Sequence, residues 1–135
     1  MQLTRESDYA VRIVLYLAKI DRYANATEVS GVLNIPNRFA RIILAKLLQS
    51  GLVSSQKGAS GGYALAKPDC SLLDAIHAVG AQIEINKCLC EGSVCERIEK
   101  GKCVVHHALT DLNERIKVGL DELKVQDVAP GFLLE

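Results

Sequence analysis

Apolar residues recur at helical spacing in the first part of the chain. Two parallel rows of i, i+4 neighbours stand out: Tyr9, Ile13 and Leu17, and beside them Ala10, Val14 and Ala18. Two such rows are typical of a helix with one buried face. We expect this helix to run from about Arg5 to Ile20, with Thr4 as its N-cap.

Two further helices are predicted before residue 51. The first is a short helix capped by Thr27 and ending near Leu33, and it should bury Val29, Val32 and Leu33. The second begins after Pro36, because proline is tolerated in the first turn of a helix, and runs over residues 37–49. The side chains expected on its inward face are Phe39, Ala40, Ile43, Leu44, Leu47 and Leu48.

The outward face of that helix carries Arg38 and Arg41, with the small residue Ala45 one turn further on. Guanidinium groups bind phosphates and read guanine, and a small neighbour permits close approach. Residues 52–56 and 63–66 then read as two strands joined by a glycine-rich turn, and Lys57 lies at its shoulder. The order of helices and hairpin predicts a mainly α winged helix-turn-helix, whose third helix enters the major groove of DNA.

The second half should hold two more helices. A capping-box pattern at Ser71 and Asp74 begins one that ends at Gly80, and the last runs over about 105–125. The last helix carries an apolar stripe of near-heptad spacing: Leu109, Leu112, Ile116, Leu120 and Leu123. This stripe can pack on a partner helix or on its own domain. We expect a loose tail from residue 127 and a buried Cys70.

Four cysteines and two histidines lie between Cys88 and His107, and the chain has only one other cysteine. This segment has no helical or strand periodicity, so it is expected to be a loop. Thiolate and imidazole ligands select zinc, copper(I) or iron–sulfur clusters. Three alternatives remain open from the residues: a cluster, a structural zinc site, and a reversible disulfide aided by Lys87 or Lys102.

Charge is unevenly distributed along the 135 residues. Residues 1–67 carry nine Lys and Arg against four Asp and Glu, a net +5, whereas residues 68–135 carry seven against twelve, a net −5. The asymmetry favours a polyanion partner for the first half. The polar start and the lack of a long apolar run predict a cytoplasmic protein without a membrane partner. No catalytic constellation stands out, so no enzyme is expected.

Several motifs together resemble the Rrf-two family of bacterial winged-helix transcription regulators, which includes iron–sulfur sensors of the IscR type and nitric oxide sensors of the NsrR type. The matching segments are Met1-Gln-Leu-Thr4, Asp8-Tyr9-Ala10, Ser50-Gly51-Leu52-Val53-Ser54-Ser55, Gly61-Gly62-Tyr63 and Leu72-Leu73-Asp74-Ala75-Ile76. The cysteine loop follows them and precedes a long helix. The resemblance covers nearly the whole chain.

The resemblance implies a homodimer joined through the long C-terminal helix and bound to a palindromic operator in double-stranded DNA. It matches Arg41 to a base-reading position and Lys57 to a basic wing residue, and regulators of the IscR type carry an acidic residue where Arg41 stands. The residues implied as the DNA-binding set are Arg38, Arg41, Lys57, Ser60, Gly61, Gly62 and Tyr63. The stripe from Leu109 to Leu123 is then the dimer interface.

The resemblance also implies an iron–sulfur cluster held by three cysteines of the loop and one further ligand. The expected set is Cys90, Cys95, Cys103 and His106. Alternatives are Cys88, because this loop has four cysteines where the family usually has three, and Asp8 or His107. The C-x4-C spacing from Cys90 also occurs in plant-type sites, and we favour a [2Fe–2S] over a [4Fe–4S] cluster.

The predicted protein is a dimeric, sequence-specific repressor whose DNA affinity is tuned by the cluster. The expected divisions are a DNA-binding domain over 1–80, a cluster loop over 81–104, a dimerisation helix over 105–126 and a flexible tail over 127–135. The alternatives are a winged-helix dimer with a structural zinc site or a thiol redox switch. An electron-transfer iron–sulfur protein is a distant alternative, since it leaves the basic N-terminal half without a purpose.

Overall fold

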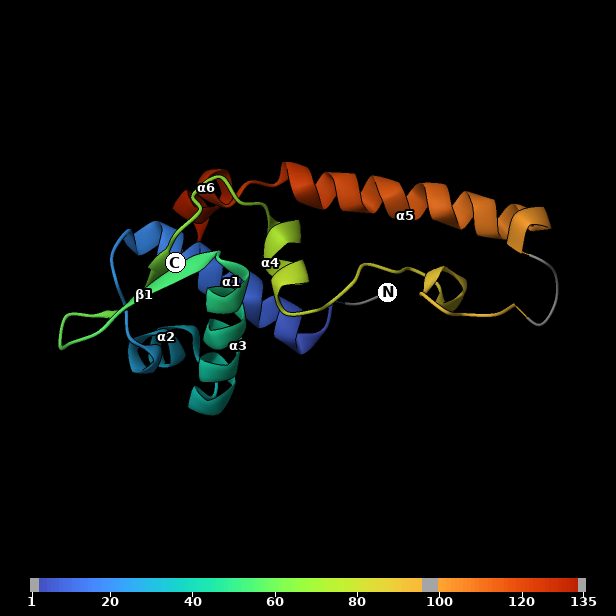
Figure 1. The fold of residues 1–135 in the computed structure, drawn as a ribbon. Coiled ribbons are helices and arrows are strands. Elements are labelled where there is room, and N and C mark those ends of the chain that lie inside the picture. The colour runs from blue at the N-terminus through green and yellow to red at the C-terminus, as the bar shows by residue number, and fades with distance from the viewer. Residues whose placement is uncertain (1–2, 96–99, 134–135) are drawn as a thin grey trace.

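The computed structural model describes residues 3–95 and 100–133. Its elements, in order, are α1 (Arg5–Ile20), α2 (Ala26–Leu33), α3 (Asn37–Ser50), β1 (Val53–Gln56), β2 (Gly62–Leu65), α4 (Leu72–Ala78), η1 (Lys87–Leu89), η2 (Lys100–Lys102), α5 (Val104–Glu122), α6 (Val125–Val128) and η3 (Ala129–Gly131). Figure 1 shows α1–α4, the hairpin and α6 as one body, from which α5 projects. This confirms the mainly α winged helix-turn-helix. Within the described ranges, no helix combines the length and apolarity needed to cross a bilayer.

The first helix has the bounds expected from its pattern. The Thr4 hydroxyl accepts a hydrogen bond from the N–H of Ser7 at 3.1 Å, and Asp21 ends the helix in the left-handed conformation with φ 48°. Ile13, Val14 and Leu17 are fully buried. Helix α1 packs against α3, α4, α6 and β2, so it is the centre of the core.

The start of α2 differs from the prediction. Its N-cap is Asn25, whose side-chain oxygen accepts from the N–H of Glu28 at 2.8 Å, while Thr27 is exposed inside the helix. Ala24, just before the cap, exchanges two backbone hydrogen bonds with Tyr63 of β2, at 2.8 and 2.9 Å. This contact with the hairpin holds the chain extended up to residue 25, so the helix begins there. The tertiary pairing, and not the nearest hydroxyl, decides the cap.

Three side chains predicted to be buried on α2 and α3 are exposed: Val32 (46%), Phe39 (44%) and Leu48 (39%). The core side of α3 is narrower than expected and consists of Ala40, Ile43, Leu44 and Leu47. The three exposed residues lie at the edges of their helix faces, where neighbouring elements cover them only in part. Phe39 nevertheless has an aromatic neighbour, since its ring centroid lies 6.5 Å from that of Tyr9.

The hairpin is fixed by two glycines that no other residue could replace without displacing backbone. Strands β1 and β2 pair antiparallel, with Val53 opposite Leu65 and Gln56 opposite Gly62. A Cβ at Gly61 would lie 2.1 Å from the carbonyl oxygen of Gln56. One at Gly62, where φ is +135°, would lie 2.4 Å from the carbonyl oxygen of Ala24. The glycine pair therefore seats the hairpin against the body.

The C-terminal segment packs on the core, contrary to the predicted loose tail from residue 127. Helix α5 ends at Glu122, earlier than expected, and the chain turns through an extended Leu123 into α6. The N–H of Val125 donates to the carbonyl oxygen of Cys70 at 2.9 Å. Val125 and Ala129 are buried against α1, and the Lys19 ammonium donates to the carbonyl oxygen of Phe132. Apolar residues in so short a segment show no period, so the sequence did not reveal this contact. Residues 134 and 135 lie outside the described residues.

Burial of Cys70, expected from the sequence, is confirmed. This burial should make the stability of the protein depend on pH. Desolvation, with smaller contributions from Asp74 and Asp69, raises the pKa of the Cys70 thiol from 9.0 to about 11. The folded protein therefore keeps this proton at pH values where the unfolded chain has lost it.

The free energy of unfolding should consequently fall as the pH rises from 9 to about 11. Denaturant unfolding of the wild type and Cys70→Ala across this pH range checks the effect. The variant should show a shallower fall, because it lacks the thiol. Equal pH slopes for the two proteins would contradict the assignment of the shift to Cys70.

Candidate functional site

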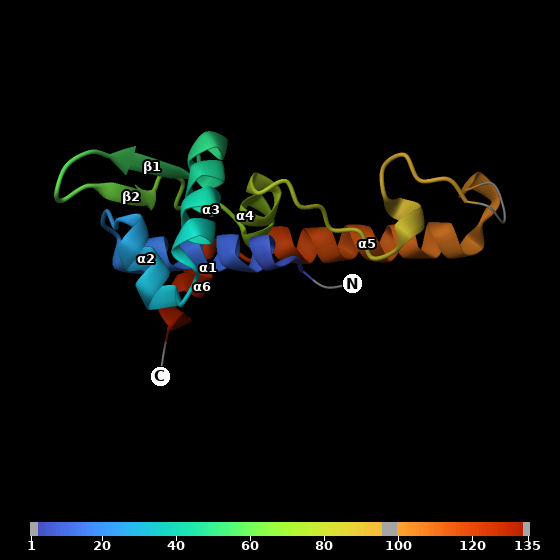
Figure 2. The same cartoon turned by 90° about the horizontal axis from the view of Figure 1, so that it is seen from below.

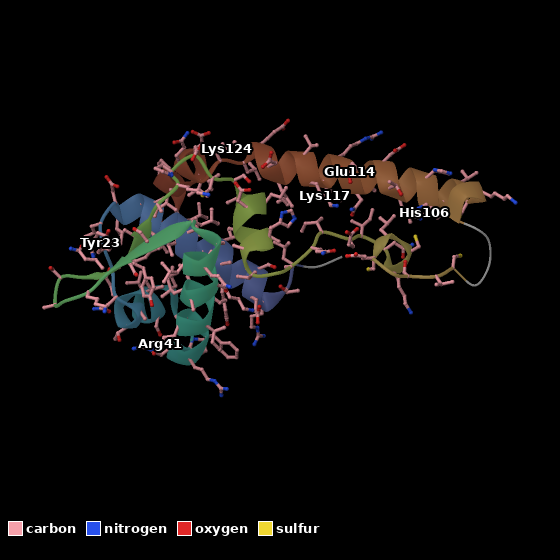
Figure 3. The ribbon with its side chains drawn as sticks, in the orientation of Figure 1. Tyr23, Arg41, His106, Glu114, Lys117 and Lys124 are labelled. Carbon is pink, nitrogen blue, oxygen red and sulfur yellow. The ribbon has the colours of Figure 1, made fainter. Side chains whose placement is uncertain are left out.

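The outer face of α3 presents two guanidinium groups to solvent. Arg38 and Arg41 are both exposed, and Figure 3 shows Arg41 on the side of the body away from α5. The Nε of Arg41 donates to the side-chain oxygen of Asn37, one turn earlier, at 2.6 Å. This bond orients the guanidinium and uses only one of its five N–H groups. The terminal nitrogens remain available for a planar acceptor pair such as a guanine edge or a phosphate.

The hairpin lies beside α3 in both views of the ribbon, at the end of the molecule opposite the cysteine loop (Figures 1 and 2). Lys57 and Ser60 at its tip are exposed. Gly61 is buried, and Tyr63 is half-buried against the core, with its backbone paired to Ala24. Among the expected wing residues, Lys57 and Ser60 thus present their side chains to solvent. The structural task of the other three is to position the tip.

Of the first two loop cysteines, Cys88 lies in the single turn of η1 and Cys90 is the residue that ends it. The side-chain amide of Asn86 donates to the sulfur of Cys88 at 3.3 Å, and the Cys90 thiol approaches the carbonyl oxygen of Asn86 at 3.9 Å. Ser93 donates through its hydroxyl to the carbonyl oxygen of Cys88 at 3.1 Å. The turn thereby places Cys90 exposed and Cys88 half-buried, so that their sulfur atoms have different surroundings.

Cys103 and His106 meet at the start of α5. Cys103 is the N-cap residue, and its sulfur accepts the backbone N–H of His106 at 3.3 Å. The Nδ1 atom of His106 is buried and finds no hydrogen-bond partner among the described residues. The neighbouring His107 differs, because its Nε2 donates to the carbonyl oxygen of Gly101 at 3.1 Å. Of the two histidines, His106 has the unused ring nitrogen.

The structure does not gather the expected ligand set into one centre. In the part of the chain that it describes, no three His, Cys, Asp or Glu side chains are close enough to hold a metal ion. Residues 96–99, between Cys95 and Cys103, lie outside that part. Asp8, the alternative ligand, is paired with Arg12 at 2.8 Å in the first turns of α1. The ion pair with Arg12 gives the Asp8 carboxylate a structural role within α1.

The donor chemistry nevertheless fits a soft metal or an iron–sulfur cluster. All five cysteines are thiols, and four of them lie in the loop. A buried imidazole nitrogen without a partner costs free energy unless a ligand or proton donor meets it. The N–H of His106 on the Cys103 sulfur is the kind of contact that supports a metal-bound thiolate. Cys90, Cys95, Cys103 and His106 are the residues that could hold such a group.

Sequence reasoning missed Asn113, which joins the loop segment to α5. This side chain is 3% exposed. Its amide nitrogen donates to the carbonyl oxygen of Ile83 at 2.8 Å and to Glu84 at 3.1 Å, and its oxygen accepts from the N–H of Ile85 at 3.0 Å. Lys117 reaches Glu84 at 3.8 Å (Figure 3). The sequence feature that could have indicated this role is the position of Asn113 directly after Leu112, within the apolar stripe of the predicted helix.

The apolar stripe of α5 is only partly covered by its own chain. Leu112 and Leu123 are 45% and 46% exposed, and Leu109, Ile116 and Leu120 are half-buried. The helix contacts α4, η1 and η2 along its inner side. The buried Asn113 is four residues after Leu109 and three before Ile116, so it lies in the same row as the half-buried part of the stripe, and Leu112 and Leu123 form its open edge. The stripe leaves an apolar surface open along a projecting helix.

Known proteins are similar to this chain in sequence and in fold. The chain is 33% identical over 108 residues to the regulator NsrR of Halalkalibacterium halodurans, covering 78% of this chain and 70% of that protein. It is 28% identical over 132 residues to the regulator IscR of Klebsiella pneumoniae, covering 95% and 79%. The structure of CymR, the global cysteine regulator of B. subtilis, superimposes with a TM-score of 0.79 at 23% identity over 97% of this chain and 98% of that one.

A structure of T. potens IscR superimposes with a TM-score of 0.73 at 20% identity and covers 100% of this chain and 93% of that one. The family described as iron-dependent transcriptional regulators, Rrf2, matches residues 3–131. Its relatives named above are regulators of transcription and not enzymes. The motifs, the winged-helix fold and this match together establish that the chain belongs to the Rrf2 family of transcriptional regulators.

Proposed function

We propose that this chain is a cytoplasmic, homodimeric repressor that binds a palindromic operator in double-stranded DNA, and that an iron–sulfur cluster at the cysteine loop tunes its affinity. The observation that carries the DNA-binding part is the outer face of α3, where Arg38 and Arg41 are exposed beside the hairpin. The relatives IscR and NsrR support the regulatory part.

DNA recognition begins with α3 entering the major groove. Arg41 reads a guanine with its terminal nitrogens, because its Nε is engaged by Asn37. Arg38 and the hairpin residues Lys57 and Ser60 contact phosphates on either side. The hairpin tip is positioned for these phosphate contacts by Gly61, Gly62 and Tyr63.

Dimerisation follows from the open stripe of α5. An apolar row with near-heptad spacing is expected to pack against the same row of a second copy, since that removes Leu109, Leu112, Ile116, Leu120 and Leu123 from water. The two copies then present two recognition helices to two half-sites. Helix α5, which would carry the dimer interface, directly follows the cysteine loop in the chain.

The cluster, when bound, supplies a group whose oxidation state or integrity reports iron–sulfur supply, redox state or nitric oxide. Cys90, Cys95, Cys103 and His106 would hold it, and we favour [2Fe–2S]. Within the chain, Asn113 fixes residues 83–85 on α5. Ser71, at the head of α4, donates to Asp121 near the end of α5 at 2.9 Å. Closure of the loop would therefore bias the tilt of α5 against the DNA-binding body.

Replacing Arg41 by alanine tests base reading. Arg41→Ala is expected to relax preference at one base pair of each half-site, by about 1–3 kcal/mol, since each bidentate contact contributes this much discrimination. Binding of a panel of single-base operator variants, measured by fluorescence anisotropy, gives the result.

Lys57→Ala is the matched control. It should weaken binding to all sequences alike and reduce the salt slope of the dimer by about two, since each protomer loses one phosphate contact. If both variants lose affinity equally for every operator sequence, Arg41 does not read a base. Binding without any sequence preference by the wild type would refute the proposed function itself.

A further inference from the structure

One exposed apolar side chain on α3 has no role in the core. Ile42 is 39% exposed. The core side of α3 is filled by its neighbours Ala40, Ile43 and Leu44. At about 100° per residue, Ile42 points away from that side. An exposed isoleucine in the middle of a helix costs apolar hydration and some helix propensity, so the fold by itself gives no reason for it.

The surroundings of Ile42 are those of the proposed DNA-reading face. Arg38 lies one turn before it and Ala45 one turn after it, and both are exposed on the same side. Arg41 is adjacent and is held by Asn37. Ile42 is thus a large apolar group on a face that also carries the two arginines, the small Ala45 and the polar Gln49.

The other two exposed apolar residues of α3 differ from Ile42. Phe39 lies at one flank of the helix, with its ring 6.5 Å from that of Tyr9. Leu48 lies at the opposite flank, next to the buried Leu47. Neither stands between the two arginines and Ala45. These two residues therefore provide comparison positions of similar exposure on the same helix.

We infer that Ile42 reads a thymine through the 5-methyl group, by apolar contact in the major groove. The inference rests on the proposed DNA-binding function. A thymine methyl is the apolar group that the major groove displays, and side chains without polar atoms select it. A β-branched residue has one strongly preferred rotamer in a helix, so Ile42 is already ordered before binding. Ala45 permits the helix to approach closely enough for the contact.

The experiment begins with selection of preferred duplexes from a random library by the full-length protein. Each thymine of the selected half-site is then replaced by deoxyuridine, which lacks only the 5-methyl group. For the wild type, one such replacement should weaken binding about fourfold for each half-site that carries it, as expected for one buried methyl per protomer. Ile42→Ala should bind the thymine and deoxyuridine duplexes equally.

Phe39→Ala and Leu48→Ala are the matched controls, and both should retain the wild-type discrimination between thymine and deoxyuridine. Circular dichroism of each variant establishes that α3 remains folded, which alanine favours. If the wild type selects a sequence but ignores every methyl, or if Ile42→Ala keeps the discrimination, the inference is wrong and the DNA-binding function stands. If no sequence is selected at all, both fail. Ile42→Ala could instead keep the methyl effect and lose self-association or binding of a protein partner. That outcome would show that Ile42 contacts protein, and it would overturn the assignment.

Discussion

Leu112→Asp is expected to convert the protein from a dimer into a monomer. Leu112 is 45% exposed in the single chain, so a carboxylate there is solvated and the fold of the monomer is preserved. In a dimer joined through the stripe of α5, the same carboxylate would be buried without a partner. Operator affinity should then fall by at least about 100-fold, because the two half-sites are no longer bound by one linked pair of recognition helices.

Val118→Asp is the matched control for the dimer face. Val118 is also exposed, at 54%, but lies about 120° around α5 from Leu112. This variant should remain dimeric and bind the operator as the wild type does. Light scattering after gel filtration gives the mass, and anisotropy gives the affinity. A monomer from Val118→Asp with a dimer from Leu112→Asp would place the interface on the other face.

Cys103→Ser is expected to abolish stoichiometric iron and sulfide in anaerobically purified protein. Cys103 is the N-cap of α5, and its sulfur accepts the N–H of His106, so it ties the loop to the helix start. Loss of a thiolate ligand should weaken metal retention more than the roughly 10- to 100-fold typical of losing a group that only supports a ligand. Visible absorption with iron, sulfide and zinc analysis measures the outcome. Cys70→Ser, outside the loop, should keep the metal.

The adjacent histidines supply a second matched pair for the metal site. His106→Gln should lose metal faster than the wild type, since its Nδ1 is buried and without a partner among the described residues. His107→Gln should retain it, because the His107 ring is bonded to Gly101. If the two variants behave alike, Cys88→Ser and Asp8→Asn decide the fourth ligand. Colourless protein with one zinc per chain would refute the cluster, and protein without metal after reconstitution would indicate a thiol switch.

The site is divided between two ends of the molecule. The arginines of α3 and the hairpin lie at one end, and the cysteine loop lies beside α5 at the other (Figure 1). In the proposed function, a signal at the loop would reach the DNA-binding body through α5 and through residues 79–86, which join the loop to α4. Two buried polar anchors lie on that route: Asn113 on the loop side, and Ser71, bonded to Asp121, where α5 returns to the body. In the proposed function, a change at the loop would act on these contacts and so shift the population of α5 orientations.

Much of the fold could be predicted because its signals are local. Helix α1 has the expected bounds, since its cap at Thr4 and its two apolar rows lie within one segment. The capping box of α4 is present as expected, with Ser71 and Asp74 bonded reciprocally. The hairpin is marked by its own glycines, and the order of these elements is enough to define a winged helix. The candidate ligands and arginines could also be found, because their residue types and spacing are visible in one dimension.

Contacts between distant segments decided the rest. Asn25 caps α2 because Ala24 pairs with Tyr63, and residues 125–132 pack on α1 although they carry no period of their own. The exposure of Ile42 and the burial of Asn113 depend on which neighbouring element covers each helix face. A sequence pattern states which residues share a face, since that follows from 3.6 residues per turn. Which of those faces meets protein and which remains open for DNA or a second copy depends on chain segments far away in the sequence, and that requires the folded structure.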